Sequence, residues 1–517
     1  MAAGMTIAGR TWWWLGGIVA LYLLLAIAMD RTFMPWCDEA WFATPGLNLA
    51  HDGSFGTPVL DETAMWGQRN LRGVHHITYW FMPLHPVVVA GWSFVAGRGL
   101  MAVRTLSLLW GLVGLGAWFL AVRKLAEPEG TRAALFMAGL LAVDFEFQWC
   151  AGQGRMDMMT EALLASAFAA YLLLRERNFT RAVLVSQTLM MLAGMTHPIS
   201  LGGFVGLLFL TLYLDGRKVR VQHVALAAVP YLVGGAAWGL FISQDPGMFR
   251  DQFYGNITGR LSRPGGWLDA IWEQYKERYL WAYGLRPDTR GLSHLKIVLY
   301  LVYMGGVAAG WAMRDFRARR EYRAWLILCV IVALCYANLD KGVQEFYLIH
   351  FMTPVIAVLA LVLDWVIRTR RVRAWAVAAV FLVMGSVQLM TTVSRIRQDA
   401  YHTRYLDATE FIRRTARPGE LIIGSTELGW ELGWNGNLID DFRLGYLTGK
   451  KPAIVVLDKN RYQEWIPKLQ ATEPQAYRYT SELLEREFVP VHRNDSYIIY
   501  ARKDRTDPSS KINNGAR

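Results

Sequence analysis

The feature that most constrains this chain is a series of long apolar blocks that fill most of its first 390 residues. An α-helix needs about 20 mostly apolar residues to cross a bilayer. The sequence therefore predicts a mostly α-helical polytopic membrane protein, and it excludes a plain soluble enzyme, a disordered chain and a disulfide scaffold. The composition agrees, because 54% of the residues are hydrophobic and only 19% are charged. The eleven candidate spans lie near residues 12–28, 101–122, 132–149, 159–174, 181–196, 199–214, 222–242, 294–313, 324–338, 346–367 and 373–392.

Lysine and arginine gather in every second loop between these blocks. Short cytoplasmic loops retain basic residues, so this alternation predicts a cytoplasmic N-terminus. The formal net charge of +12 therefore orients the helices in a cell (plasma or inner) membrane, and it does not indicate a nucleic-acid partner. The segments that this orientation places outside are residues 30–100, 150–158, 243–293 and everything after about 394.

Two apolar segments need separate interpretation. Residues 12–28 lack a small-residue cleavage site, so we interpret them as an uncleaved anchor rather than a signal peptide. Residues 79–96 contain Pro83 and Pro86, and counting them as a span would invert every later loop. We therefore expect a juxtamembrane or re-entrant helix there, on the outer face.

The composition changes near residue 394, which divides the chain into a membrane domain, 1–393, and a more polar domain, 394–517. Residues 407–416 have helical periodicity. Strands alternating with helices predict a small extracytoplasmic α/β domain, with a disordered end from residue 504. The strand-like runs lie at residues 421–423, 453–457 and 498–500.

An aromatic patch in this tail, around Trp430 and Trp434, lies among turn-forming glycines. Aromatic rings can stack on sugar faces, so the patch could bind a glycan. A loop that packs onto the membrane domain is an equally good interpretation.

The first outer segment begins with two adjacent carboxylates, Asp38 and Glu39, between Trp36 and Trp41. Acidic residues at the end of an apolar helix are costly unless they are solvated or functional. The pair is therefore either a catalytic site or part of an aromatic belt whose charges point into water.

The second acidic motif is formed by Arg155 and Asp157 in a short outer loop, followed by Glu161 in an apolar helix. An arginine and a carboxylate at this spacing can bind an anion or a metal ion. They can equally cap the helix, because a carboxylate is favourable at a helix N-terminus.

Four histidines lie on the same predicted face: His75, His76, His85 and His197. The spacing of the first three matches no standard metal motif. A single histidine such as His197, at the end of an apolar run, is more often a satisfied helix-end residue than a ligand.

A further polar segment, residues 340–347, leads into the span near 346–367 and ends at Tyr347. These polar groups, with His197 counted apart from the other three histidines, make five sites, and all five lie on the predicted outer face. Chemistry on this face cannot use cytoplasmic nucleotides, so an activated donor would have to be carried by a lipid.

The order of these motifs resembles the C-type glycosyltransferase superfamily. It looks closest to the bacterial branch related to protein O-mannosyltransferases and lipid A aminoarabinose transferases. The motifs that carry the resemblance are Asp38-Glu39, the run Met82 to Pro86 with the helix start at Arg104, Arg155-x-Asp157, and Phe346-Tyr347 leading to Thr353-Pro354. The chain departs from the family pattern at Met82, His85 and Phe346, where proline or lysine, tyrosine and arginine are common.

The resemblance implies inverting transfer of a hexose or pentose from a polyprenyl-phosphate donor to a lipid, glycan or protein acceptor of the cell envelope. It implies that the catalytic carboxylates are Asp38, as the general base, and Glu39, which supports the site or binds the acceptor rather than acting as a second base. The candidate donor-phosphate contacts are Arg155, His85 and His197; Asp157 and Glu161 would orient the donor or a metal; and His75, His76 and Tyr347 are acceptor or lid candidates. A divalent cation is left open, with Asp38 and Asp157 as its candidate ligands.

Two other classes of function compete with this interpretation. A transporter or flippase of lipid-linked sugars predicts internal repeats and polar residues near the bilayer midplane, whereas the polar residues here lie at one face. A non-catalytic scaffold gives no reason for Asp38 and Arg155 to share a side. The sequence does not identify the sugar or the acceptor, and pairing of Cys37 with Cys150 is a possibility it leaves open.

Overall fold

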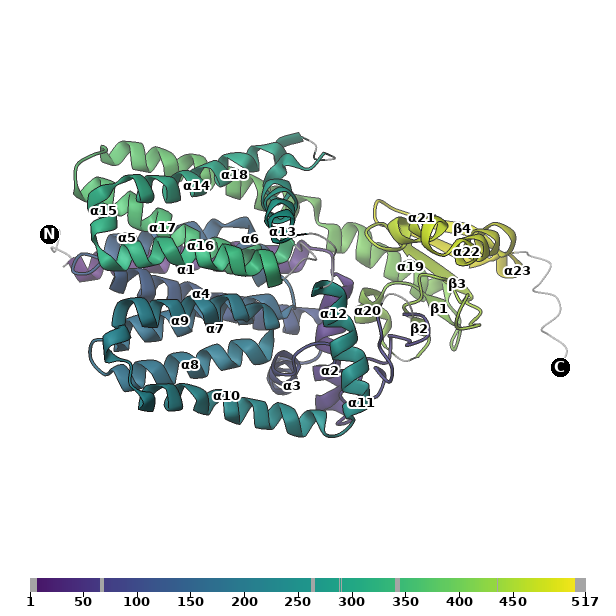
Figure 1. Ribbon diagram of the computed structural model, residues 1–517. Helices are drawn as coiled ribbons and strands as arrows, with labels where there is room; N and C mark the ends of the chain where they lie inside the picture. Colours follow the sequence, from purple (N-terminus) through teal and green to yellow (C-terminus); the bar gives the residue numbers. More distant parts are fainter. Residues whose placement is uncertain are drawn as a thin grey trace.

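The computed structural model describes residues 7–65, 69–261, 266–287, 289, 291–339, 345–434 and 436–506. A bundle of long helices carries a small sheet domain at one end, and the N-terminus lies at the opposite end of the bundle (Figure 1). The long helices are α1 (Ile7–Thr32), α4 (Leu100–Leu125), α7 (Met156–Leu174), α8 (Phe179–Thr196), α9 (Leu201–Asp215), α10 (Val221–Ile242), α14 (Lys296–Ala312), α16 (Arg320–Leu339), α17 (Ile349–Arg368) and α18 (Ala374–Gln398).

Nine helices of the described residues are long and apolar enough to cross a membrane, or ten if one bent pair counts as a span. The chain is therefore a multi-pass membrane protein. The prediction of eleven spans exceeds this number because it includes residues 181–196. These residues do form a helix, α8, but α8 is not among the nine.

The bent pair corrects a prediction, because residues 132–149 do not form one straight helix. They form α5 (Thr131–Val143) and α6 (Phe145–Ala151), which meet at an angle of 64°. Asp144 causes the break, since its side chain accepts the backbone N–H groups of Glu146 and Phe147 and caps α6. Tyr303 and Gln388 donate to the same carboxylate at 2.9 and 2.8 Å, which satisfies it inside the bundle.

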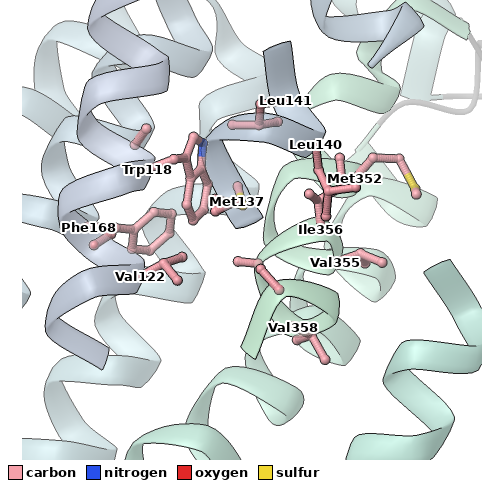
Figure 2. Close-up of a cluster of buried hydrophobic side chains, with 14 of the residues drawn as sticks. Trp118, Val122, Met137, Leu140, Leu141, Phe168, Met352, Val355, Ile356 and Val358 are labelled. Carbon is pink, nitrogen blue, oxygen red and sulfur yellow. The ribbon is translucent and has the colours of Figure 1, made fainter. Parts of the chain in front are cut away.

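The core of the bundle lies around α17, whose apolar window is entirely buried. Lipid tails are as apolar as leucine, so close packing rather than the hydrophobic effect holds such helices together. Figure 2 shows one cluster in which side chains of α4, α5, α7 and α17 meet. Its labelled members are Trp118, Val122, Met137, Leu140, Leu141, Phe168, Met352, Val355, Ile356 and Val358.

Short helices lie at the end of the bundle next to the sheet domain (Figure 1). They include α2 (Cys37–His51), α3 (Leu84–Ala96), α11 (Pro246–Phe249), α12 (Gly255–Leu261), α13 (Trp267–Glu273) and the π-helix η4 (Gln274–Leu285), whereas α15 (Arg314–Ala318) joins α14 to α16. The helix α3 has 13 residues, and about 20 are needed to span a bilayer. It is therefore too short to cross, as expected for residues 79–96.

The C-terminal domain contains a five-stranded sheet of order β2-β1-β3-β5-β4. The strands β2, β1 and β3 are parallel, and β5 pairs with β3 and β4 in the antiparallel sense. Its elements are α19 (Asp407–Thr415), β1 (Ile422–Ile423), α20 (Gly429–Leu432), β2 (Leu438–Ile439), β3 (Ile454–Asp458), α21 (Tyr462–Thr472), α22 (Pro474–Glu487), β4 (Phe488–Arg493), β5 (Tyr497–Arg502) and α23 (Lys503–Thr506).

This domain confirms the predicted α/β class, but two details of the prediction differ. The strands β2 and β4 were not predicted, because β2 has only two residues and β4 contains Pro490. The predicted disordered end starts inside α23, and residues 507–517 lie outside the described part of the chain.

The sheet domain docks on the segment that links α1 to α4. Leu60 pairs with Asp440 as an isolated bridge next to β2, and the Lys450 ammonium lies 2.7 Å from the Asp61 carboxylate. Trp430 and Trp434 pack against a cluster of apolar side chains from α2, α3 and α4. The aromatic patch of the tail thus has the packing role.

The contact between α2 and α3 depends on Gly46. A Cβ atom at position 46 would lie 2.3 Å from the backbone carbonyl oxygen of Pro86. A Cβ atom at position 91, on α3, would meet no neighbouring atom within 4 Å. We predict that Gly46→Ala forces the two helices apart and costs about 1–3 kcal/mol, as overpacking does. Its melting temperature in detergent should fall by several degrees, and that of the control Gly91→Ala should not; equal values for the two variants would contradict this packing.

Candidate active site

Two predicted motifs meet in space although they are far apart in the sequence. Asp38 is in the first turn of α2, and Arg155 immediately precedes α7. The Arg155 guanidinium forms an ion pair with the Asp38 carboxylate and donates from Nε to Oδ2 of Asp157 at 2.8 Å. Arg155 and Asp157 are buried, whereas the Asp38 side chain keeps 14% of its surface exposed. The structure thus places one cation between two carboxylates, of which only Asp38 reaches solvent.

Aromatic rings enclose the Arg155 guanidinium. Its central carbon lies 3.9 Å from the ring centre of Phe346, 5.1 Å from that of Trp36 and 5.2 Å from that of Phe42. A cation over an aromatic face is attracted by the ring quadrupole. Phe346, one of the departures from the family pattern, therefore supports Arg155 in this chain.

Glu39 has a different environment from its neighbour Asp38. It is fully buried, and its carboxylate binds the Arg104 guanidinium through two bonds of 2.9 Å. It also accepts the backbone N–H groups of Gly154 and Trp36 at 2.8 and 3.0 Å. Glu39 therefore ties the start of α2 and the loop before Arg155 to α4.

Gly154 permits this arrangement by its small size. A Cβ atom at position 154 would lie 2.6 Å from a methyl group of Val103 on α4. The loop can thus approach α4 closely enough for its N–H group to reach Glu39, and this fixes the backbone on which Arg155 stands.

His85 lies at the start of α3, where the positive charge of Arg155 acts on its ring. Its ring is buried, it donates to the backbone carbonyl of Phe42, and its Nδ1 has no hydrogen-bond partner among the described residues. Burial, helped by the positive charge of Arg155, lowers the pKa of His85 from 6.5 to about 4. At neutral pH the ring is therefore neutral and offers hydrogen bonds rather than a positive charge.

His197 and Tyr347 form a second pair of polar side chains. The His197 Nδ1 accepts the backbone N–H of Ile199 at 3.0 Å, so the ring proton is on Nε2, which lies 3.1 Å from the Tyr347 oxygen. Tyr347 follows Phe346, the ring on which Arg155 lies, in the short helix η6 (Glu345–Leu348). His197 is therefore a helix-end residue and also a support for Tyr347.

Three of the predicted residues have other surroundings. Glu161 lies one turn further along α7, where it binds Trp118, His350 and Thr353. His75 and His76 are exposed, and their ring centres lie 4.0 Å apart. These two rings contact each other at the surface, with their planes tilted by 46°.

Within the described part of the chain, no group of three or more His, Cys, Asp or Glu side chains is arranged to hold a metal ion. The two candidate ligands, Asp38 and Asp157, both face the Arg155 guanidinium, which already supplies the positive charge. The residues present therefore fit an arginine-centred site rather than a cation held by these carboxylates. Cys37 and Cys150 are both free thiols.

Some residues in the site and in the buried clusters around it were not anticipated. Phe42 was hidden in an ordinary aromatic pattern, whereas His350 could have been suspected as a histidine within an apolar span. A buried cation elsewhere in the fold was also not anticipated: Arg278 of η4 is 1% exposed and interacts with Tyr279. Of the segment 340–347, residues 340–344 lie outside the described residues.

Comparison with known proteins gives a fold but no sequence match. No family model and no curated protein matches the chain. The apo structure of ArnT from Cupriavidus metallidurans superposes with a TM-score of 0.61 at 17% identity, covering 94% of this chain and 97% of that chain. The same protein bound to undecaprenyl phosphate gives 0.59 at 16% identity, covering 94% and 98%.

A second similar structure is the archaeal oligosaccharyltransferase AglB from Archaeoglobus fulgidus, in complex with an inhibitory peptide and a dolichol-phosphate. It gives a TM-score of 0.52 at 13% identity, covering 96% of this chain and 75% of that chain. Both proteins are C-type glycosyltransferases. The chain therefore has the fold that its motifs implied, a C-type polytopic membrane domain followed by a small sheet domain.

The Glu39–Arg104 pair gives a prediction about stability. Glu39→Ala leaves the buried Arg104 guanidinium without a counter-charge, and breaking such a pair costs about 3–5 kcal/mol. We expect a large loss of folded yield and of melting temperature in detergent. Asp61→Ala breaks the more exposed pair with Lys450 and should cost at most about 1 kcal/mol. If Glu39→Ala were as stable as wild type, Glu39 would not be the counter-charge that stabilises the buried Arg104.

The burial of His85 gives a prediction about pH. Its pKa in the folded chain, about 4, lies below its ordinary value of 6.5. As the pH falls through this window the unfolded chain binds the proton first, so the free energy of unfolding falls, by up to roughly 3 kcal/mol. Melting temperatures at pH 7.5 and 4.5 should therefore differ less for His85→Gln than for wild type. The exposed control His76→Gln should behave like wild type. An equal fall of the melting temperature between pH 7.5 and 4.5 in all three proteins would overturn the prediction.

Proposed function

We propose that this protein transfers a sugar, with inversion, from a polyprenyl-phosphate donor to a membrane-associated or cell-envelope acceptor on the outer side of the membrane. The observation that carries the proposal is the partly exposed Asp38 carboxylate held against the buried Arg155 guanidinium. The orientation follows from the basic alternate loops, which put the sheet domain and the start of α2 outside.

Asp38 is proposed as the general base. Of the two adjacent carboxylates it is the one with solvent access, because Glu39 is fully buried and bound to Arg104. A base has to lie within about 3 Å of the proton that it removes, which requires an accessible oxygen. Glu39 is therefore assigned a positioning role through the backbone of Trp36 and Gly154.

Arg155 is proposed to stabilise the departing phosphate. In the reaction the acceptor oxygen or nitrogen bonds to the anomeric carbon, Asp38 takes the acceptor proton, and the bond from the anomeric carbon to the phosphate oxygen breaks. The leaving group is the polyprenyl phosphate anion, which needs cationic and hydrogen-bonding partners rather than a proton. A protonated Asp38 no longer neutralises Arg155, so the guanidinium charge becomes available as the phosphate gains charge.

Neutral hydrogen bonds complete the proposed donor site. Tyr347, next to Phe346 in the chain, supplies a hydroxyl whose position is held by His197. His85 is neutral and has a free Nδ1 among the described residues. Asp157 orients Arg155 by accepting a hydrogen bond from the Arg155 Nε. His75 and His76, exposed on the first outer segment, are assigned to an acceptor or lid surface.

The donor class is supported by the similar structures. One structure of ArnT holds undecaprenyl phosphate, and one of the archaeal oligosaccharyltransferase holds dolichol-phosphate with a peptide. Both lipids are polyprenyl-type phosphates, which is the class expected for a donor that has to be reached from the membrane.

The test uses the purified full-length chain in proteoliposomes with undecaprenyl-phosphate-linked arabinose, mannose, hexuronate or amino sugar and a cell-envelope extract as acceptor. Wild type should transfer labelled sugar and release undecaprenyl phosphate. Asp38→Asn should lower transfer by about 100-fold or more, since general-base catalysis contributes about 100- to 10,000-fold.

The matched control is Asp61→Asn, which changes another ion-paired carboxylate of the same outer segment and should keep near-normal transfer. Near-normal transfer by Asp38→Asn at equal folded yield would remove Asp38 as the base. Movement of the intact lipid-linked sugar across the bilayer, without product in any acceptor, would instead identify a flippase.

A further inference from the structure

A second buried polar cluster, which the proposed reaction does not use, lies inside the bundle below Arg155. We call it the clamp, and its members are Trp118 of α4, Glu161 of α7, and His350 and Thr353 of α17. The Glu161 Oε1 accepts from Trp118 Nε1 at 2.9 Å and from Thr353 Oγ1 at 2.6 Å, and its Oε2 lies 3.0 Å from His350 Nδ1. One carboxyl group thus joins three helices.

The clamp is fully enclosed by protein. Glu161, Thr353 and Trp118 are each 1% exposed, and the His350 side chain is 0% exposed. Buried acidic groups in a membrane domain are costly, and replacing a buried charged pair by apolar side chains often leaves stability unchanged or improved. Stability alone therefore does not explain this cluster, whereas its directional hydrogen bonds do fix how the helices lie against one another.

The clamp is about one helical turn away from the candidate site along α7 and along the continuous helical segment formed by η6 and α17. Glu161 follows Asp157 by four residues, and His350 follows Phe346 by four residues. Residues four apart lie on the same helix face, about 6 Å from each other along the axis. The same two chain segments thus touch twice, once through Glu161 and His350 and once where Arg155 lies 3.9 Å from the Phe346 ring centre.

We propose that the clamp is a positioning device for the donor-phosphate site. It holds α7 and α17 in the register at which Arg155 lies on Phe346 and beside Tyr347, so its residues act through Arg155 rather than by touching the donor. This inference rests on the proposed function and deepens it, because it states what determines donor affinity.

The other end of α7 provides a matched control. There the Tyr171 hydroxyl and the Arg175 guanidinium each donate to the Asp215 carboxylate of α9 at 2.7 Å. This network is also buried, but Tyr171 is ten residues beyond Glu161, about 15 Å along the helix. Its loss should loosen the bundle without moving Arg155.

The experiment compares Glu161→Ala, Glu161→Gln and Tyr171→Phe with wild type in the full-length chain. We expect Glu161→Ala to raise the donor KM about tenfold or more and to leave the acceptor KM unchanged. Glu161→Gln should recover most of the donor affinity, because an amide can still accept from Trp118 and Thr353 and donate to His350. Tyr171→Phe should lower the melting temperature but leave the donor KM within twofold of wild type.

A double-mutant cycle separates positioning from general loosening. The effects of Glu161→Ala and Phe346→Leu on the donor KM should be clearly non-additive, because both act through Arg155. Those of Glu161→Ala and Tyr171→Phe should be additive. An unchanged donor KM in Glu161→Ala, or additive effects in the first cycle, would overturn the proposal.

Binding of undecaprenyl phosphate, followed by its effect on the melting temperature, provides a readout that does not need catalysis. Wild type should be stabilised more than Glu161→Ala at the same lipid concentration. If wild type transferred no sugar, the proposed function would fall, and this binding would decide the inference alone. Equal binding by wild type and Glu161→Ala, including none by either, would overturn it.

Discussion

The structure around the candidate site depends on the burial of one positive charge. The Arg155 guanidinium is 2% exposed, and a charge removed from water has to be paired and hydrogen-bonded. Asp157 pairs with it inside the protein, Asp38 pairs with it from the edge of solvent, and three aromatic rings surround it. This places a carboxylate that reaches solvent directly against a cation that does not. Such an asymmetry is what a group transfer with an anionic leaving group requires.

Adjacent residues of a helix do not face each other, and this explains the different positions of Asp38 and Glu39. The start of α2 turns Glu39 toward Arg104 and the bundle, where it accepts bonds from four donor groups. Asp38 is then left at the edge of solvent beside Arg155. Two chemically equivalent side chains thus acquire a positioning role and a proposed catalytic role only through the direction in which each one leaves the helix.

Much of the fold could be predicted because apolar length and the placement of basic residues are one-dimensional signals. They give the bundle, the non-spanning α3 and the separate C-terminal α/β region. They do not give the break at Asp144, whose cause is a side chain that caps the next helix. The motifs of the site could be named, and Asp38 and Arg155 could be expected on one face. Their direct ion pair and that of Glu39 with Arg104 could not be predicted, since these residues are 117 and 65 positions apart. Glu161 was grouped with Asp157 by proximity in the sequence, and only the packing of α4 and α17 shows that its partners are different.

The spacing of Asp157 and Glu161 connects the candidate site with the clamp. A four-residue step puts both carboxyl groups on one face of α7, and opposite it lie Phe346 of η6 and His350, in the first turn of α17. A membrane bundle has little hydrophobic force to fix the register of its helices. Directional polar contacts at two successive turns therefore constrain both the translation and the rotation of α7 against α17, which a single contact could not do. The position of Arg155 thus depends on the buried polar cluster around Glu161, which lies one helical turn deeper in the bundle.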